Sequence, residues 1–465
     1  MIQWSTGRAA PHSKPLTGHS FWQRHAGVQS VPDNPTSDHA PLPSQVDFVV
    51  AGGGFAGLSA ALALCEAEPT ASILLLEANV LGHGASGRNG GLLSPLPAPV
   101  WLLTADANAE HAWAFLHINA RVHATASRLL DDAPSGRITP AVLRLQSLGR
   151  LTEAGLARVA RTIERAGIAV ERQDGTGGRL AVDLSTHTID PYLTVLALGA
   201  LARRRGIQIA EHTAVAGIED TSEGVRVALM SGATIDARRA IVCTNAYTGS
   251  VALPEKVAAK VAYNFMVAAE IGDTGNRGQP PFSGAVAVEC SDATAEKGGC
   301  PLLQFPPDRF TVELNTSYVF HRLYEGHVVY GGIERFKPYG ENDFAVPPDV
   351  LVGLEKLLDK SFPGAGLEPS QTWGGCYHQT ANDLPLLTTI GAHGHIVVNC
   401  GYGGTGVAMS MVCAPLAAAL ARDGQFSSDD DRRLFETIKA TRLPIAGLAR
   451  LVLGVAGDVV RMRKV

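Results

Sequence analysis

The chain has 465 residues, of which 46% are hydrophobic and 18% are charged, and its formal net charge is -5. This length and composition predict a globular protein with two domains or more. The small excess of acidic residues gives no broad basic surface, so the composition argues against nucleic-acid binding.

The N-terminal extension, residues 1–45, is rich in Pro, Ser, His and Gly and has no continuous apolar stretch. It therefore shows no signal peptide, and we expect no integral membrane segment. Two outcomes are open for this extension. Part of it is disordered, or Phe21-Trp22-Gln23 docks on the folded body.

The first regular stretch predicts a dinucleotide site. An apolar strand beginning at Val46 runs into Gly52-x-Gly54-x-x-Gly57, and an apolar helix follows. These glycines allow a tight turn, close approach of a pyrophosphate and close packing of the helix on the strand. A second apolar run ends in Glu77, about twenty residues after Gly57, where a carboxylate can accept hydrogen bonds from a ribose.

A second glycine-rich loop follows at Gly82–Gly91, with Arg88 and Asn89 near its centre. It can bring backbone donors and a cation against another part of a large cofactor, for which a nicotinamide enzyme would have little use. A plain flexible connection is the alternative, because glycine clusters are common in loops.

The next part of the chain, from about Val100 to Val182, has a mainly helical pattern. Asp190 and Pro191 then begin a helix, and a β-hairpin follows over residues 213–235. The strand after it stops in Thr244-Asn245, small polar residues that would face the ligand crevice of an open α/β sheet. A mere loop is the alternative at this point.

A mixed β region spans roughly Lys256–Phe336 and interrupts the nucleotide-binding pattern, so we expect a separate substrate sheet. The stretch Trp373–Pro385 then leads to a strand, Ile396–Cys400. A third glycine-rich junction, Gly401–Gly406, opens a long helix there, and it can point another helix N-terminus at a ligand.

Cysteine and histidine usage gives little support to a metal site. The seven cysteines are widely spaced and include no C-x-x-C pair, and the fifteen histidines show no H-E-x-x-H. The cysteines indicate reduced thiols in a cytoplasmic protein.

Four motifs together resemble those of the D-amino-acid-oxidase-like FAD oxidoreductases. They are Gly52-x-Gly54-x-x-Gly57, Gly84–Gly91, Trp373-x-Gly375 followed by Thr380-x-Asn382-x-x-Pro385, and Gly401-Tyr402-x-Gly404-x-Gly406. Within these enzymes the chain looks most like the gamma-glutamylputrescine oxidase group. The resemblance implies an α/β fold, with a discontinuous Rossmann-like FAD-binding domain and a mixed-sheet α+β substrate domain.

The expected domains follow this pattern. The FAD-binding domain would comprise residues 46–100, 186–255 and 370–425, and the substrate domain 101–185 and 256–369. A C-terminal helical tail, residues 426–465, would follow them. Peripheral contact of that tail with a membrane is an alternative to packing on the protein.

The resemblance also implies which residues hold FAD. The first glycines would meet the pyrophosphate, Glu77 the adenosine ribose, the Gly82–Gly91 loop the ribityl chain and flavin ring, and Val215 the adenine through its backbone. The third junction would meet the pyrimidine end of the flavin. The full set expected to contact FAD is Gly52, Gly54, Phe55, Ala56, Gly57, Glu77, Ala78, Ser86, Arg88, Asn89, Gly90, Gly91, Val215, Thr244, Asn245, Gly403, Gly404, Thr405 and Gly406.

The implied reaction is FAD-dependent oxidation of an amine or amino-acid C–N bond to an imine, which water hydrolyses, while oxygen reoxidises the flavin and gives hydrogen peroxide. Arg322 would pair with a substrate carboxylate, and Tyr377 and His378 would touch the small-molecule amine. Structural roles are the alternatives for all three. Some sarcosine-oxidizing relatives attach FAD through a cysteine in about this loop, so covalent attachment at Cys376 and an idle buried thiol are both open.

Two other functions share these motifs: a FAD-dependent amine dehydrogenase that passes electrons to a carrier protein or quinone, and a noncatalytic flavin-binding protein. Three departures from the family pattern leave the amine unnamed. A long Gly- and Pro-rich stretch spans about 272–308, Asn382 stands where an aspartate is more usual, and His321 precedes Arg322 where an aromatic residue is expected.

Overall fold

The computed structural model describes most of the chain. The described residues are 19–27, 41–97, 109–147, 150–175, 178, 180–257, 260–270, 308–314, 318–336, 345–362, 365, 367, 369–380 and 384–440. Several expectations therefore lie outside them: most of the N-terminal extension, nearly all of the stretch 272–308, Asn382, and residues 441–465 of the C-terminal tail.

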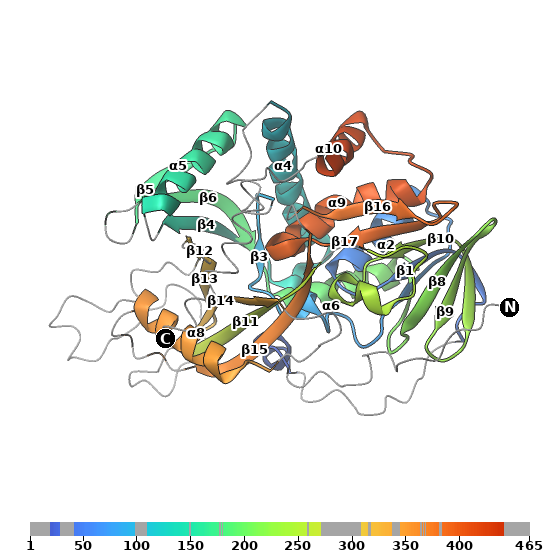
Figure 1. Cartoon of the computed structure of the whole chain (residues 1–465), viewed down its shortest axis with the longest axis horizontal. Helices are drawn as coiled ribbons and strands as arrows, with labels where there is room; N and C mark the ends of the chain where they lie inside the picture. The colour runs from blue at the N-terminus through green and yellow to red at the C-terminus, as the bar shows by residue number, and fades with distance from the viewer. Residues whose placement is uncertain are drawn as a thin grey trace.

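An eight-stranded sheet carries the predicted nucleotide-binding pattern (Figure 1). Its order is β16-β17-β10-β1-β2-β7, and the β8–β9 hairpin joins it through β10. The bounds are β1 Gln45–Ala51, β2 Ile73–Leu76, β7 Gln208–Ala210, β8 Val215–Thr221, β9 Gly224–Leu229, β10 Thr234–Val242, β16 Leu386–Ile390 and β17 Ile396–Cys400. Neighbours from β17 to β7 pair in parallel, so their carboxyl ends lie at one edge of the sheet.

Three helices share a hydrophobic core with one face of this sheet: α2 (Phe55–Ala67), α6 (Pro191–Arg204) and α9 (Gly406–Ala421). The predicted start of α6 is confirmed, because the Asp190 side chain accepts hydrogen bonds from two backbone N–H groups of its first turn. The β8–β9 hairpin packs with the other face. Coverage on both faces explains why β1 and β2 are almost continuously apolar.

Helix α9 is apolar on all sides because it is buried on all sides. With η7 (Gly403–Thr405) before it, it forms the one helix of the described residues that is long and apolar enough to cross a membrane. Its mean hydropathy is 1.6, and 78% of that window is buried inside the protein. Core packing therefore accounts for its composition.

A nine-stranded sheet forms the second body of the molecule. Its order is β15-β11-β14-β13-β12-β4-β6-β3, with β5 paired to β6. The bounds are β3 Leu92–Leu93, β4 Thr139–Ser147, β5 Glu171–Asp174, β6 Leu180–Thr188, β11 Lys260–Glu270, β12 Arg309–Leu314, β13 Tyr318–Tyr324, β14 His327–Phe336 and β15 Pro369–Gln379. This mixed sheet agrees with the substrate sheet expected from the sequence.

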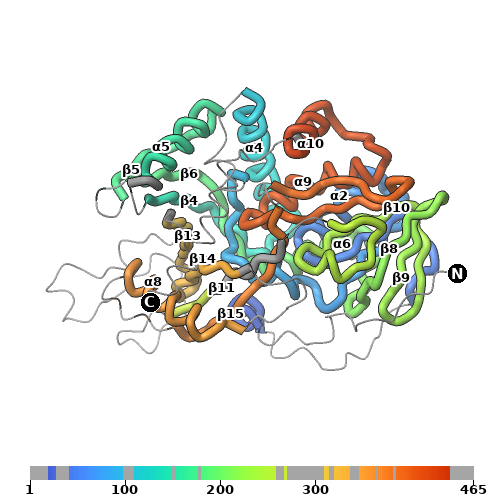
Figure 2. The backbone as a smooth tube through the Cα atoms, in the orientation of Figure 1, coloured from blue at the N-terminus to red at the C-terminus, as the bar shows by residue number. Residues whose placement is uncertain are grey.

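Helices cover the nine-stranded sheet unequally. One face packs on α8 (Pro348–Ser361), which lies outside β11 and β14 (Figure 2). The opposite face shares the main core with α4 (Ala109–Asp132), α5 (Arg150–Arg165) and the eight-stranded sheet. The short helix α1 (Phe21–His25) docks against β15 and α6, and α10 (Asp429–Ala440) packs on α4 and α9.

One sequence expectation is incomplete and another is wrong. The stretch from about Val100 to Val182 is mainly helical, through α4 and α5, but β4 and β5 also lie within it and β6 begins there. In β4, residues Ala141, Leu143 and Leu145 are buried at every second position, which is the period of a strand. The expected loop at Trp373–Gln379 is also a strand, because β15 pairs with β11 along its length. By sheet membership the division therefore falls after β15 and not at residue 370.

Candidate active site

The glycine-rich segments expected to bind the cofactor lie at the carboxyl edge of the eight-stranded sheet. β1 leads into Gly52–Gly57 and α2, and β17 leads into η7 and α9. β10 lies between β1 and β17 and ends beside Thr244. Segments some 350 residues apart in the chain are thus brought to one edge of the sheet, where open α/β folds bind their ligands.

The β1–α2 turn fits only glycine at its closest contacts. A Cβ at Gly57 would lie 1.8 Å from the backbone oxygen of Gly52, and a Cβ at Gly52 would lie 2.7 Å from the oxygen of Cys243. Helix α2 begins at Phe55, and Ala56 follows in its first turn. Free N–H groups at such a helix start suit an anion such as a pyrophosphate.

Glu77 lies beside this turn. Its Oε2 accepts the N–H of Gly53 at 2.6 Å, and its Oε1 accepts the N–H of Asn79 at 2.9 Å. Burial raises the pKa of Glu77, and these two hydrogen bonds oppose that rise. The backbone N–H of Thr213 donates to the Glu77 carbonyl at 2.7 Å, which places the start of β8, at Val215, next to this group. The predicted ribose and adenine residues are therefore neighbours, with the exposed Ala78 between Glu77 and Asn79.

The segment Gly82–Gly91, here called the cofactor loop, contains η2 (Ala85–Gly87) and is tied to the start of α2 and to β15. Ser86 Oγ accepts the N–H of Phe55 at 3.0 Å, which joins the loop to the start of α2. Arg88 is 2% exposed, and its guanidinium donates to the carbonyls of His83 at 2.9 Å and Gly374 at 3.3 Å. Burial lowers the pKa of Arg88.

Gly90 is the point at which the cofactor loop meets the nine-stranded sheet. A Cβ at Gly90 would lie 2.7 Å from the ring of Phe320 and 3.2 Å from that of Phe310. These two rings stack with centroids 5.5 Å apart. The aromatic pair leaves no room for a side chain at Gly90, and the absence of one lets the loop backbone pack directly against the substrate sheet.

The ends of β10 and β17 are joined through β15. Asn245, with φ of 46°, begins η5 (Asn245–Ser250), and its Oδ1 accepts the N–H of His378 at 3.1 Å. Tyr402 forms an isolated bridge with Gln379 of β15, and its carbonyl accepts a bond from Thr405 Oγ1 at 3.3 Å. At the start of α9, Gly404 is exposed while Gly403 and Thr405 are buried and Gly406 is half-buried.

The residues of this edge fit a flavin dinucleotide. A Cβ at Gly52 or Gly57 would clash with the backbone of the protein itself, so the β1–α2 turn keeps its tight form, and Asn89 fixes the cofactor loop by bonding Ala85, Ser86 and Gly91. Within the described residues, no hydrogen bond takes up the backbone N–H of Asn89 or that of Gly90. Two such donors suit the carbonyl and nitrogen acceptors of a flavin ring, and together with the glycine turns they are here called the cradle.

The side chain of Arg322 is buried and donates hydrogen bonds to the backbone of the protein. It is 5% exposed, and its Nη1 donates to the carbonyls of Gly91 at 3.2 Å and Ile189 at 2.9 Å, with a longer bond of 3.4 Å to Gly90. Burial lowers the pKa of Arg322 to about 10. These contacts support the structural alternative, and pairing with a substrate carboxylate stays a prediction.

Tyr377 and His378 point to opposite sides of β15. The Tyr377 hydroxyl donates to the Glu334 carboxylate of β14, and its side chain is half-buried. The His378 ring is 1% exposed, and its Nδ1 lies 3.6 Å from Cys400 Sγ. Burial lowers the pKa of His378 to about 4, so the ring is neutral near pH 7. Of the three predicted substrate contacts, Tyr377 is the accessible one.

Cys376 is fully buried beside Tyr247. Its Sγ lies 3.7 Å from the Tyr247 hydroxyl, and burial raises its pKa to about 11. A thiol with such a pKa is a weak nucleophile near pH 7, which favours the idle-thiol alternative over covalent attachment. The described cysteines, Cys65, Cys243, Cys376, Cys400 and Cys413, are all free.

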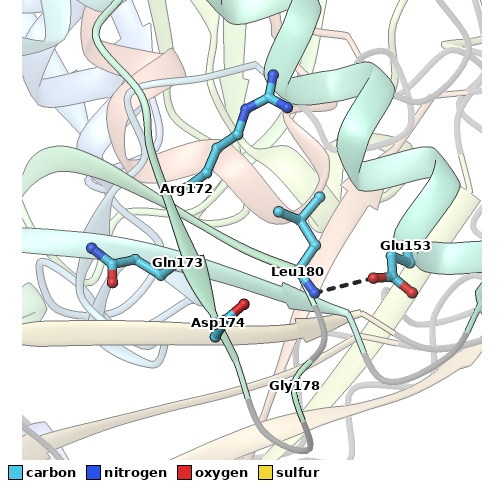
Figure 3. A pocket seen from close by; sticks show the side chains of 6 residues that line it. All are labelled: Glu153, Arg172, Gln173, Asp174, Gly178 and Leu180. Carbon is cyan, nitrogen blue, oxygen red and sulfur yellow. Dashed lines mark hydrogen bonds between the residues drawn. The ribbon is translucent and has the colours of Figure 1, made fainter.

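Other features of the described residues do not add a second site. No group of three or more His, Cys, Asp or Glu side chains there could hold a metal ion. A cavity of about 440 Å³ lies between α5 and the β5–β6 pair, where Glu153 accepts the N–H of Leu180 at 3.3 Å (Figure 3). It lies at the end of β6 that pairs with β5, whereas β3, which follows the cofactor loop, pairs with the other end of β6 (Figure 1).

Sequence reasoning missed three side chains that hold the cofactor loop. Ser20 Oγ donates to the Gly87 carbonyl at 2.6 Å, Trp22 Nε1 to that of Asn89 at 2.7 Å, and Trp373 Nε1 to that of Arg88 at 3.0 Å. One signal for the first two was present. Ser20 and Gln23 have the spacing of a capping box, which the structure confirms at the start of α1.

Comparisons with known proteins agree with one another. The family model described as DAO, FAD dependent oxidoreductase, matches residues 47–420. The chain is 26% identical over 414 residues to the probable oxidoreductase OrdL of Rhizobium meliloti, covering 84% of this chain and 86% of that protein. A shorter match, 55% over 47 residues, is to gamma-glutamylputrescine oxidoreductase of Escherichia coli, covering 10% and 11% of the two chains. The crystal structure of glycine oxidase from Geobacillus kaustophilus superposes with a TM-score of 0.63 at 17% identity, covering 83% and 97% of the two chains.

Proposed function

Because this chain belongs to the DAO family of FAD-dependent oxidoreductases, we propose that it oxidises the C–N bond of a small amine or amino acid. Membership confirms the resemblance found from the four motifs, together with the α/β fold class, the FAD cofactor and the assignment as an enzyme. The names of its relatives and of the similar glycine oxidase support an amino compound as substrate.

The observation that carries the proposal is the cradle at the carboxyl edge. Bound there, FAD supplies a two-electron oxidation of the C–N bond to an imine, which water hydrolyses to a carbonyl compound. In this proposal the turns at Gly52–Gly57 and Gly403–Gly406 would bind the cofactor. The Phe310–Phe320 pair packs against Gly90 and so supports one side of the cofactor loop.

Tyr377 is the residue that we assign to substrate contact. It shares a face of β15 with Gly375, which packs on Arg88, and its hydroxyl is held by Glu334. A hydroxyl that donates its proton to a carboxylate can still accept a hydrogen bond from an amine N–H. It can therefore orient a neutral amine without protonating it. His378 is buried and neutral near pH 7, so it serves the packing between β15 and β17.

Oxygen is the electron acceptor that we propose, with hydrogen peroxide as the product. A dehydrogenase that passes electrons to a carrier or quinone would use the same cradle. A cytoplasmic location, expected from the reduced thiols, also stays a proposal.

One screen tests these proposals. The purified yellow protein is mixed with primary amines, N-methyl amino acids and gamma-glutamylated polyamines, while flavin bleaching is followed without oxygen and peroxide release with oxygen. Bleaching and stoichiometric peroxide from one class support the oxidase. Bleaching without peroxide identifies the dehydrogenase, and failure of every class to bleach the flavin contradicts amine oxidation and favours a noncatalytic flavoprotein. The same protein stripped of FAD is the control.

A further inference from the structure

Side chains engage the carbonyl oxygens of the second part of the cofactor loop, from Ala85 to Gly91. From Ala85 to Gly91, each carbonyl accepts a hydrogen bond from a side-chain donor: Asn89 Nδ2 bonds Ala85 and Ser86, Ser20 Oγ bonds Gly87, Trp373 Nε1 bonds Arg88, Trp22 Nε1 bonds Asn89, and Arg322 Nη1 bonds Gly90 and Gly91. The donors come from α1 and its N-cap residue, from β13 and β15, and from the loop itself. An uninterrupted run of this kind turns the oxygens toward the protein.

Two of these bonds set the direction of the free N–H donors. A trans peptide unit is planar, and its C=O and N–H point in opposite directions. The carbonyl of Asn89 and the N–H of Gly90 belong to one such unit, and the carbonyl of Arg88 and the N–H of Asn89 to the unit before it. Trp22 therefore fixes the direction of the Gly90 N–H, and Trp373 fixes that of the Asn89 N–H.

Helix α1, which carries Trp22, is itself held firmly in place. Its capping box joins Ser20 and Gln23, and Phe21 and Trp22 are 1% and 0% exposed. The Phe21 ring packs on Trp373 and on His327 of the β13–β14 hairpin, with centroids 6.1 Å and 5.0 Å away. The N-terminal segment thus connects the cofactor loop to the substrate sheet (Figure 1, dark blue beside β15).

We propose that Trp22 and Trp373 are positioning residues for FAD. Each indole N–H holds one peptide of the cofactor loop with its carbonyl inward, so that the N–H groups of Asn89 and Gly90 are presented to the cofactor. Without the indole donor, the buried carbonyl lacks its partner and the peptide next to Gly90 turns more easily, because glycine accepts a wide range of backbone angles. The proposal rests on FAD dependence and not on the identity of the substrate.

The test measures FAD affinity in the absence of substrate. Trp22→Phe and Trp373→Phe keep an aromatic ring but remove the donor, and Trp113→Phe is the matched control, because Trp113 lies on α4 under Arg433, with its ring centroid 4.0 Å from the guanidinium carbon. Each protein is freed of FAD and titrated with it by flavin fluorescence, and the unfolding temperature of each apoprotein is recorded.

We expect the FAD dissociation constant to rise about tenfold in Trp22→Phe and in Trp373→Phe, which is about 1.4 kcal/mol, and to stay within twofold in Trp113→Phe. Dissociation constants within twofold of the original protein in both test variants would overturn the proposal, because the bonds would then stabilise the fold equally with and without FAD. If Trp22→Phe does not fold, Trp373→Phe decides the question. Since no turnover is measured, failure here is distinct from failure of the amine-oxidation proposal.

Discussion

The cofactor edge of the eight-stranded sheet and the nine-stranded sheet differ in the atoms that make their close contacts, which are backbone atoms in the first and side-chain atoms in the second. At the cofactor edge the backbone itself makes the contacts, as in the approach of Gly57 to the Gly52 oxygen or of Gly90 to Phe320. In the nine-stranded sheet, side chains such as Tyr377 and Arg322 each have a partner on another strand or loop. Short local motifs are thus enough to predict the cofactor, whereas the substrate depends on how strands far apart in the chain are paired.

Gly57→Ala gives the largest expected effect. The new Cβ would lie 1.8 Å from the Gly52 oxygen, a backbone atom that cannot move without opening the β1–α2 turn. We expect the free energy of unfolding to fall by about 3 kcal/mol or more, with loss of bound flavin. Urea unfolding and the flavin absorbance of the purified protein measure both.

Gly353→Ala is the matched control in the other region. It lies within α8, and its new Cβ would meet only the flexible end of Ile333, at 3.0 Å. Alanine is the better helix former, so we expect stability to rise by up to about 1 kcal/mol and flavin content to stay unchanged. Equal destabilisation by the two substitutions would contradict the contrast between the regions.

The sequence was most informative where glycine was required. The Gly52–Gly57 turn, the cofactor loop and the Gly403–Gly406 junction were all found, and the structure places them at one edge because β1, β10 and β17 are neighbours. Glu77 could also be predicted from a local pattern, because it directly follows the last residue of β2. Whether each predicted residue contacts FAD stays a prediction.

The contacts of the substrate sheet were harder to predict from the sequence because they join residues far apart in the chain. No sequence motif near Arg322 indicates that its guanidinium donates to the carbonyls of Gly91 and Ile189. The sequence of β15 is not typical of a strand, because two adjacent glycines, Gly374 and Gly375, interrupt its side-chain pattern. A Cβ at Gly375 would lie 3.3 Å from Arg88 Cβ, and this tight contact is visible only once the sheets are assembled.

His321 provides a pH test within the nine-stranded sheet. Its ring lies between Tyr330 and Phe362, 6.2 Å and 4.9 Å away between centroids, and burial lowers its pKa to about 3. The unfolded chain, with a histidine pKa near 6.5, binds a proton before the folded protein does. Stability contributed by the neutral ring is therefore complete above about pH 6.5 and is lost progressively as the pH falls toward 3.

The free energy of unfolding of the His321→Phe variant should fall less steeply as the pH is lowered. Between pH 7 and pH 5, we expect it to lose roughly 2 kcal/mol less of its free energy of unfolding than the original protein does. Urea titrations at the two pH values, with flavin bound, measure the difference. Parallel losses in the two proteins would mean that His321 becomes charged in the folded state, and that this face of the sheet is wetter than its packing indicates.

Among the substitutions that are not controls, Tyr377→Phe has the smallest expected effect, and it separates the two faces of the substrate sheet. The substitution removes the hydroxyl bonded to Glu334, so we expect kcat/KM for the best amine to fall about tenfold while the FAD dissociation constant stays within twofold. Tyr330→Phe is its control, because the Tyr330 hydroxyl lies 3.3 Å from Ser361 Oγ of α8, on the opposite face. That variant should lose stability and keep its kinetics. If both variants lowered kcat/KM equally, the hydroxyl of Tyr377 would act through the general stability of the sheet, and substrate recognition would have to be sought outside β15.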